Sequence, residues 1–134
     1  MNDRYFRFRQ RREEFNKALS LLSIQSKKDY FKFDEINLAA TLQFFSLTFE
    51  LGWKMLKDYL KAEAIDAKIP REVIKEAFEI QLIECGHVWV EMLAARNEIA
   101  HIYNEDRAKK LLLKIMEKFV EPLVKLGDDV RCLG

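Results

Sequence analysis

The chain has 134 residues, of which 49% are hydrophobic and 34% are charged, and its formal net charge is +1. These values suit one folded globular domain over residues 1–134 and exclude a disordered chain. The balanced charge gives no global electrostatic reason to bind nucleic acid, so any anion site must be local. Four Gly and two Pro leave little room for a sheet with many turns, and they favour helices.

The first predicted helix begins near Asp3, a good N-cap residue, and ends near Ile24. Apolar residues recur in it at helical spacing and form a core stripe: Phe8, Phe15, Ala18, Leu19 and Leu22. Three arginines, Arg4, Arg7 and Arg11, fall together on another flank. This flank is either a solvated charged face or a ridge that contacts RNA phosphates or a partner protein.

The second predicted helix extends from Glu35 to Ala62, capped by Asp34, and it is the most apolar element. A helix that is apolar over more than half its circumference is central, or faces both a core and a partner chain. Gly52 in its interior costs roughly 1 kcal/mol against Ala, which close approach of another backbone would explain. We therefore predict a twofold dimer in which this helix meets its own copy.

Three further helices are predicted in the second half of the chain. Pro70 suits the first turn of a short helix over about residues 71–80. A fourth helix extends from about His87 to Ala100, and a fifth from about Glu105 to Leu126, with a kink expected at Pro122. The elements predict an all-α fold, an antiparallel four-helix up-and-down bundle with a short additional helix.

Cysteine usage and hydropathy indicate the compartment. Cys85 and Cys132 are the only cysteines, and no histidine cluster accompanies them at ligand spacing. We therefore expect free thiols, with no metal and no cofactor. No apolar signal core follows Met1, and no run approaches the roughly 18 apolar residues of a membrane span. These features predict a cytoplasmic protein without a membrane partner.

The end of the fourth helix carries the most informative stretch, residues 96–103, which reads R-N-x3-H-x-Y. Arginine binds phosphate through a planar fork of donors, and histidine exchanges a proton near neutral pH. Tyrosine adds a hydroxyl group. On an ideal helix, the five-residue step from Arg96 to His101 turns the two side chains well apart. They converge only if the helix ends near His101, or if a second chain completes the site.

Each motif residue also has a structural interpretation. Arg96 lies on the apolar face of its helix, so it needs a carboxylate, a phosphate or a water-filled cleft beside it. His101 alone could bond backbone at a helix end, and Tyr103 alone could be a packing residue. The acids that could pair with Arg96 are Glu50, Glu91 and Glu98.

Together, the motif residues also suit RNA chemistry. RNA cleavage without metal needs a base for the ribose 2′-hydroxyl and a cation for the phosphorane charge. One His and one Arg supply both, and a symmetric pair of sites can supply base and acid from different chains. His87, the other histidine, is interpreted as a surface or capping residue.

The motif resembles the R-x4-H-x-Y motif of HEPN domains, and the likeness extends over nearly the whole chain. Several segments are similar to the nucleotidyltransferase substrate-binding protein family, which includes the HepT-like toxins. These segments are Gln43-Phe44-Phe45, Phe49-Glu50-Leu51-Gly52-Trp53-Lys54, Leu56-Lys57-Asp58-Tyr59-Leu60, Pro70-Arg71-Glu72-Val73-Ile74 and Trp89-Val90-Glu91-Met92.

The resemblance implies a bundle that dimerises, with the two motifs lining a cleft at the interface. It implies a toxin of a toxin–antitoxin pair, a metal-independent endoribonuclease with Arg96 and His101 catalytic and Asn97 orienting the cleft. The antitoxin would be an MNT-type nucleotidyltransferase that adds AMP to Tyr103 and silences the RNase.

Two alternatives remain open at the sequence level. The chain could be a non-catalytic subunit that binds substrate or nucleotide for a two-component nucleotidyltransferase, or a plain helical interaction protein with a degenerate site. It is not itself the transferase, which needs a Gly-Ser turn followed by D-x-D to hold magnesium and nucleotide. Asp128 and Asp129 are adjacent and lack that context.

Overall fold

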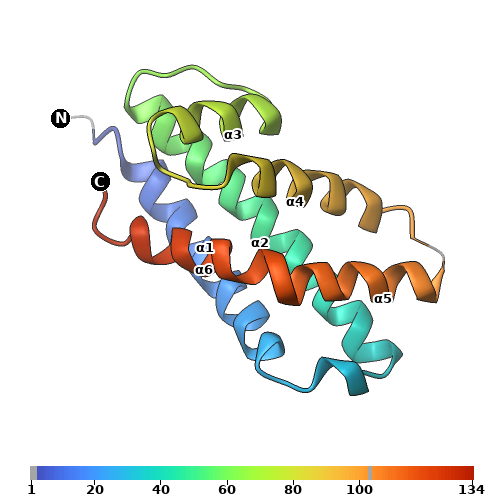
Figure 1. The fold of residues 1–134 in the computed structure, drawn as a ribbon. Coiled ribbons are helices and arrows are strands. Elements are labelled where there is room, and N and C mark those ends of the chain that lie inside the picture. Colours follow the sequence, from blue (N-terminus) through green and yellow to red (C-terminus); the bar gives the residue numbers. More distant parts are fainter. Residues whose placement is uncertain (1–2, 103) are drawn as a thin grey trace.

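The computed structural model describes residues 3–102 and 104–134, and every regular element in these ranges is helical. The elements are α1 (Phe6–Ser26), a 3-10 turn (Tyr30–Lys32), α2 (Glu35–Ala62), α3 (Pro70–Glu79), α4 (Gly86–Ile99), α5 (Glu105–Lys114), a π-helical segment (Ile115–Phe119) and α6 (Val120–Asp129). Figure 1 shows α1 and α2 as an antiparallel pair, covered by α4 and by the rod of α5 and α6. Short α3 packs beside the C-terminal part of α2. The predicted all-α antiparallel bundle with a short additional helix is confirmed.

The helix boundaries follow from local capping. α2 begins where predicted, because the carboxylate of Asp34 accepts a hydrogen bond from the Asn37 N–H at 2.7 Å. α1 begins at Phe6, later than predicted. The carboxylate of Asp3 instead accepts from the Tyr5 N–H at 3.1 Å, which forms a turn ahead of the helix.

The sequence predicts a kink at Pro122. The rod of α5 and α6 is irregular, but ahead of the proline rather than at it. The backbone widens to a π-helix over Ile115–Phe119 and returns to α-helix at Val120. A proline has no amide hydrogen, and its ring clashes with the carbonyl four residues earlier, here that of Lys118. The wider turn ahead of the proline accommodates both effects, so the helix continues to Asp129 without ending.

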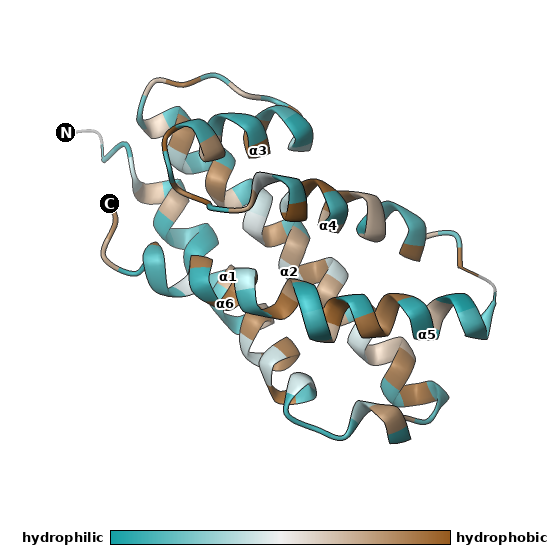
Figure 2. Cartoon of the chain, viewed as in Figure 1, coloured by the Kyte–Doolittle hydropathy of each residue, from teal (hydrophilic) through white to brown (hydrophobic). Residues whose placement is uncertain are grey.

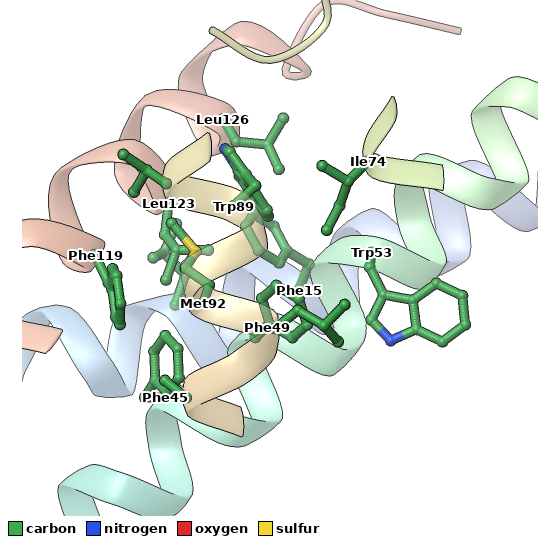
Figure 3. Close-up of a cluster of buried hydrophobic side chains, with 14 of the residues drawn as sticks. Phe15, Phe45, Phe49, Trp53, Ile74, Trp89, Met92, Phe119, Leu123 and Leu126 are labelled. Carbon is green, nitrogen blue, oxygen red and sulfur yellow. The ribbon is translucent and has the colours of Figure 1, made fainter. Parts of the chain in front are cut away.

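The core is a layer of large apolar side chains that joins α4 to the other helices. Phe15, Phe49 and Trp89 are almost fully buried at its centre (Figure 3), and the rings of Phe45 and Phe119 stack with their centres 5.4 Å apart. Figure 2 shows apolar and polar positions interspersed along the helices, and the buried positions are almost all apolar. The packing fixes α4 against α2 and thereby positions the end of α4.

Packing within the chain explains why a glycine occupies position 52 in the interior of α2. Gly52 is buried, and a Cβ atom added to it would lie 3.1 Å from Cε1 of Phe15 and 4.0 Å from Cζ3 of Trp89. The expectation that another backbone approaches Gly52 is therefore wrong, because two aromatic side chains of the same chain occupy that space. The apolar surface that α2 leaves exposed is at Ile36 and Leu47.

Two sequence expectations concern the surface of the molecule. Cys85 and Cys132 are both exposed free thiols, as predicted. Among the helices of the described ranges, none is long and apolar enough to cross a lipid bilayer.

Candidate functional site

The end of α4 satisfies one of the two conditions set by the motif spacing. The helix ends at Ile99, and the His101 N–H donates to the carbonyl of Glu98 at 2.9 Å in the turn that follows. The His101 side chain is exposed there, and Asn97 is exposed on the last turn of the helix. Tyr103, the predicted modification site, lies outside the described residues.

Arg96 is half-buried on α4 and has an acidic partner on the neighbouring helix. Its Nη1 lies 2.9 Å from Oε2 of Glu50 on α2, and its guanidinium carbon lies 6.0 Å from the centre of the Phe49 ring. Its Nε is buried without a hydrogen-bond partner among the described residues. The ion pair offsets part of the cost of burying the Arg96 guanidinium, and it crosses from α4 to α2.

The other two candidate acids have different partners. Glu91 accepts from Nζ of Lys118 at 2.7 Å, and Glu98 pairs with Arg107. Of the three acids that the sequence left open for Arg96, the structure therefore selects Glu50.

Three donors converge on the carboxylate of Glu50. Besides Arg96, the indole Nε1 of Trp53 donates to Oε2 at 3.1 Å, and Nζ of Lys54 lies 3.3 Å from Oε1. Burial acts to raise the pKa of Glu50, but the Trp53 hydrogen bond and the charges of Arg96 and Lys54 outweigh it and lower the pKa below its ordinary value. Glu50 is therefore a fixed anion that orients the Arg96 guanidinium.

The loop from α4 to α5 is held at both ends. The Asn104 side chain caps α5, accepting from the N–H groups of Asp106 at 2.8 Å and Arg107 at 3.3 Å. The side chain of Arg107 pairs with Glu98 on the last turn of α4. Ile102 packs against the core. These contacts hold both ends of the segment that carries the exposed His101.

The structure brings some predicted site residues together and leaves others apart. Arg96 joins Glu50 and Trp53, whereas no hydrogen bond links Arg96 to His101 within the described residues. Sequence reasoning missed Trp53 and Lys54 as parts of the site, although their spacing of three and four residues from Glu50 on one helix is the signal that places them together.

The Arg96 end of the arrangement has donors that could bind an anion. A guanidinium carries five N–H donors, and only part of the Arg96 fork is used by Glu50. The Arg96 side chain keeps 27% of its surface exposed, but its Nε is buried, so an approaching phosphate would have to use donors on the Nη atoms.

Comparison with known proteins gives the class of the protein. The family model described as "Nucleotidyltransferase substrate binding protein like" matches residues 10–131, and the chain belongs to this HEPN-like family. A protein of Haemophilus influenzae named "Probable ribonuclease HepT" is 28% identical over 89 residues, which span 63% of this chain and 61% of that protein. The match therefore spans less than two thirds of the relative's length. A Thermus thermophilus protein of known crystal structure is 25% identical, with a TM-score of 0.79 over 87% of this chain and 98% of its own.

Replacing Glu50 by Gln should lower stability near neutral pH and flatten its pH dependence. Because the folded-state pKa of Glu50 is lowered, its ionised form stabilises the fold above the ordinary pKa of 4.5, and this contribution is lost as the pH falls through the folded-state value. The pair is partly exposed, so solvent screening limits the loss at pH 7 to about 1 kcal/mol. Urea unfolding followed by circular dichroism between pH 3 and 7 measures both effects.

Glu121→Gln, which removes an exposed carboxylate on α6, is the matched control for this measurement. If the free energy of unfolding of the parent and of Glu50→Gln changes with pH in the same way from pH 3 to 7, the ion pair does not stabilise the fold.

Proposed function

We propose that this chain is a HepT-like toxin, a metal-independent endoribonuclease whose site is built from Arg96 and His101. The proposal is carried by a single observation. An arginine fixed by an ion pair to Glu50, with donors still free, lies on the last turns of a helix that ends just before an exposed histidine. Membership of the family and the similarity to a protein named probable ribonuclease HepT support it.

The proposed mechanism uses the ribose 2′-hydroxyl as the nucleophile. His101 takes the 2′-hydroxyl proton, and the oxygen attacks the adjacent phosphorus. Arg96 stabilises the charge on the phosphorane oxygens, and Asn97 helps to orient the cleft. The bond to the 5′-oxygen then breaks, and that oxygen takes a proton from an acid. The products are a 2′,3′-cyclic phosphate and a 5′-hydroxyl.

The acid in this mechanism comes from a second copy of the chain. A homodimer would place two copies of the motif in one cleft, so that one His101 acts as base and the other as acid. The apolar side chains that α2 leaves exposed, Ile36 and Leu47, with the half-buried Phe44 and Leu51, supply an apolar surface for such an interface.

Sedimentation velocity at micromolar concentration should therefore give a dimer, and a monomer would contradict the composite site.

The partner in this proposal is a nucleotidyltransferase of the MNT type that acts as antitoxin. It would transfer AMP from a nucleoside triphosphate to the hydroxyl of Tyr103 and release pyrophosphate. The added phosphate would occupy the donors of Arg96, and the adenosine would fill the cleft.

A second candidate function follows from the description of the family. A substrate-binding subunit of a two-component nucleotidyltransferase would use the same cleft to hold nucleotide or substrate without cleaving RNA. The two functions differ in whether His101 is needed for a chemical step, which the next experiment measures.

Substitution of either proposed catalytic residue should slow RNA cleavage by about two orders of magnitude or more while leaving the fold intact. We expect His101→Ala to slow cleavage of a fluorescent oligoribonucleotide by roughly 10²–10⁴-fold, since general acid–base catalysis contributes about that much. Arg96→Lys should lose about 10²-fold or more, because an ammonium lacks the planar fork. His87→Ala, at the exposed start of α4, is the matched histidine control and should cleave like the parent.

Cleavage that persists undiminished in purified His101→Ala protein would exclude the catalytic role and favour the substrate-binding subunit.

Tyr103→Phe should remain an active RNase but resist silencing by the partner transferase, because it lacks the hydroxyl that accepts AMP. Co-expression with the transferase, followed by intact-mass measurement and peptide mapping, should find one added AMP on the parent and none on Tyr103→Phe. Addition of AMP at another residue, or equal silencing of both proteins, would overturn this part of the proposal.

A further inference from the structure

The N-terminal arginines divide into two groups by their contacts. Arg9 pairs with Asp3 and donates to the carbonyl of Gly134 at 2.8 Å. Arg12 donates to the carbonyls of Val130 at 2.8 Å and of Leu133, near the C-terminus, at 2.7 Å. These two arginines hold the chain ends together, and they leave Arg7 and Arg11 on the outer flank of α1, with Arg4 in the turn ahead of it.

A second row of cations lies on the outer face of α2. Lys54, Lys57 and Lys61 follow Glu50 at steps of four, seven and eleven residues, which places all four on one side of the helix. The row therefore starts at the ion pair between Glu50 and Arg96 and continues toward the C-terminal end of α2.

Antiparallel packing brings the helices that carry the two rows together, with Asp58 of α2 contacting Arg11 of α1. Nε of Arg11 lies 3.3 Å from Oδ2 of Asp58, and the Tyr5 hydroxyl donates to Glu63 at 2.5 Å, so the start of α1 lies beside the end of α2. A hollow of about 280 Å³ opens on the α1 side, lined by Arg7, Gln10, Arg11 and Glu14. The surface formed by Arg4, Arg7, Arg11, Lys54, Lys57 and Lys61 is here called the basic stripe.

The basic stripe is a local charge excess on a chain with a net charge of +1. The acids on or beside it are Glu14, Glu50, Asp58 and Glu63, and two of them, Glu50 and Asp58, are engaged by cations. Among the described residues, Arg7, Lys57 and Lys61 form no ion pair, and Arg7 and Lys61 are exposed. Unpaired cations in a row are suited to a linear polyanion, because each can neutralise one phosphate.

We propose that the basic stripe binds the phosphate backbone of single-stranded RNA and leads it to Arg96. The inference rests on the proposed ribonuclease function and adds where the rest of the substrate lies. Eleven residues of helix from Glu50 to Lys61 span about 16 Å, enough for several nucleotides. Contacts to phosphates position a strand without reading its bases, so the stripe should bind RNA of any sequence.

Charge reversal at three residues tests the proposal. The stripe variant Arg7→Glu, Lys57→Glu, Lys61→Glu is compared with a control variant of equal charge change, Lys75→Glu, Lys110→Glu, Lys114→Glu, on α3 and α5. Binding is measured by fluorescence anisotropy with a 2′-O-methyl 12-mer, which lacks the attacking hydroxyl and stays intact. Circular dichroism checks folding, and Lys57→Ala with Lys61→Ala provides a milder stripe variant.

The stripe variant should bind the 12-mer at least about tenfold more weakly at 100 mM salt, while the control variant stays within about twofold of the parent. The slope of log affinity against log salt should fall in magnitude by about two, since each phosphate contact on a single strand contributes about 0.7. Equal losses in both variants, or parent-like binding by the stripe variant, would overturn the proposal and leave the stripe as a solvated face or a protein contact.

The experiments distinguish an error in the proposed RNA-binding stripe from an error in the proposed ribonuclease function. A dinucleotide that reaches only the motif should be cleaved by the stripe variant with the parent's rate, because no residue of the motif is changed. Loss of dinucleotide cleavage in the stripe variant would contradict the proposal that the basic stripe is separate from the catalytic site. Absence of cleavage in the parent would remove the ribonuclease function, while the anisotropy measurement would still decide whether the stripe binds RNA.

Discussion

The ion pair between Arg96 and Glu50 is the interaction on which the candidate site depends. A half-buried guanidinium needs an anion, and among the described residues α2 supplies one at 2.9 Å. Glu50 is itself held by Trp53 and Lys54, so the pair belongs to a network that fixes the position of α4 along α2. The same network leaves part of the Arg96 fork free, and an arginine that is both anchored and accessible is what phosphate recognition requires.

Termination of α4 is the second constraint, because a continued helix would turn His101 away from the side of Arg96. The helix ends at Ile99. The next helix begins separately, where the Asn104 side chain caps its first N–H groups. The pair between Glu98 and Arg107 then ties the two helix ends together. The candidate site therefore combines two helix ends with one cross-helix ion pair, on a bundle core of aromatic residues.

The sequence predicts those parts of the fold that depend on local chemistry. The capping residue Asp34 predicts where α2 begins, and the helical spacing of apolar residues predicts how far it extends. Both signals depend only on residues that are neighbours in the sequence. The partner of Arg96 stays open among three acids, since an ion pair between helices depends on their relative register. The interpretation of Gly52 is wrong for the same reason: a tolerance for close packing does not say whether Phe15 or another chain fills the space. Likewise, Pro122 indicates a break, while the turn that absorbs it depends on the packing of the rod.

The central claim is that Arg96 and His101 cleave RNA through its own 2′-hydroxyl. The ends of the products test this most directly. Purified protein is incubated with a defined oligoribonucleotide in excess chelator, and the fragments are identified by mass spectrometry. The account predicts fragments ending in a 2′,3′-cyclic phosphate, paired with fragments that begin with a 5′-hydroxyl. Fragments with a 3′-hydroxyl and a 5′-phosphate, or an oligonucleotide that stays intact, would contradict it.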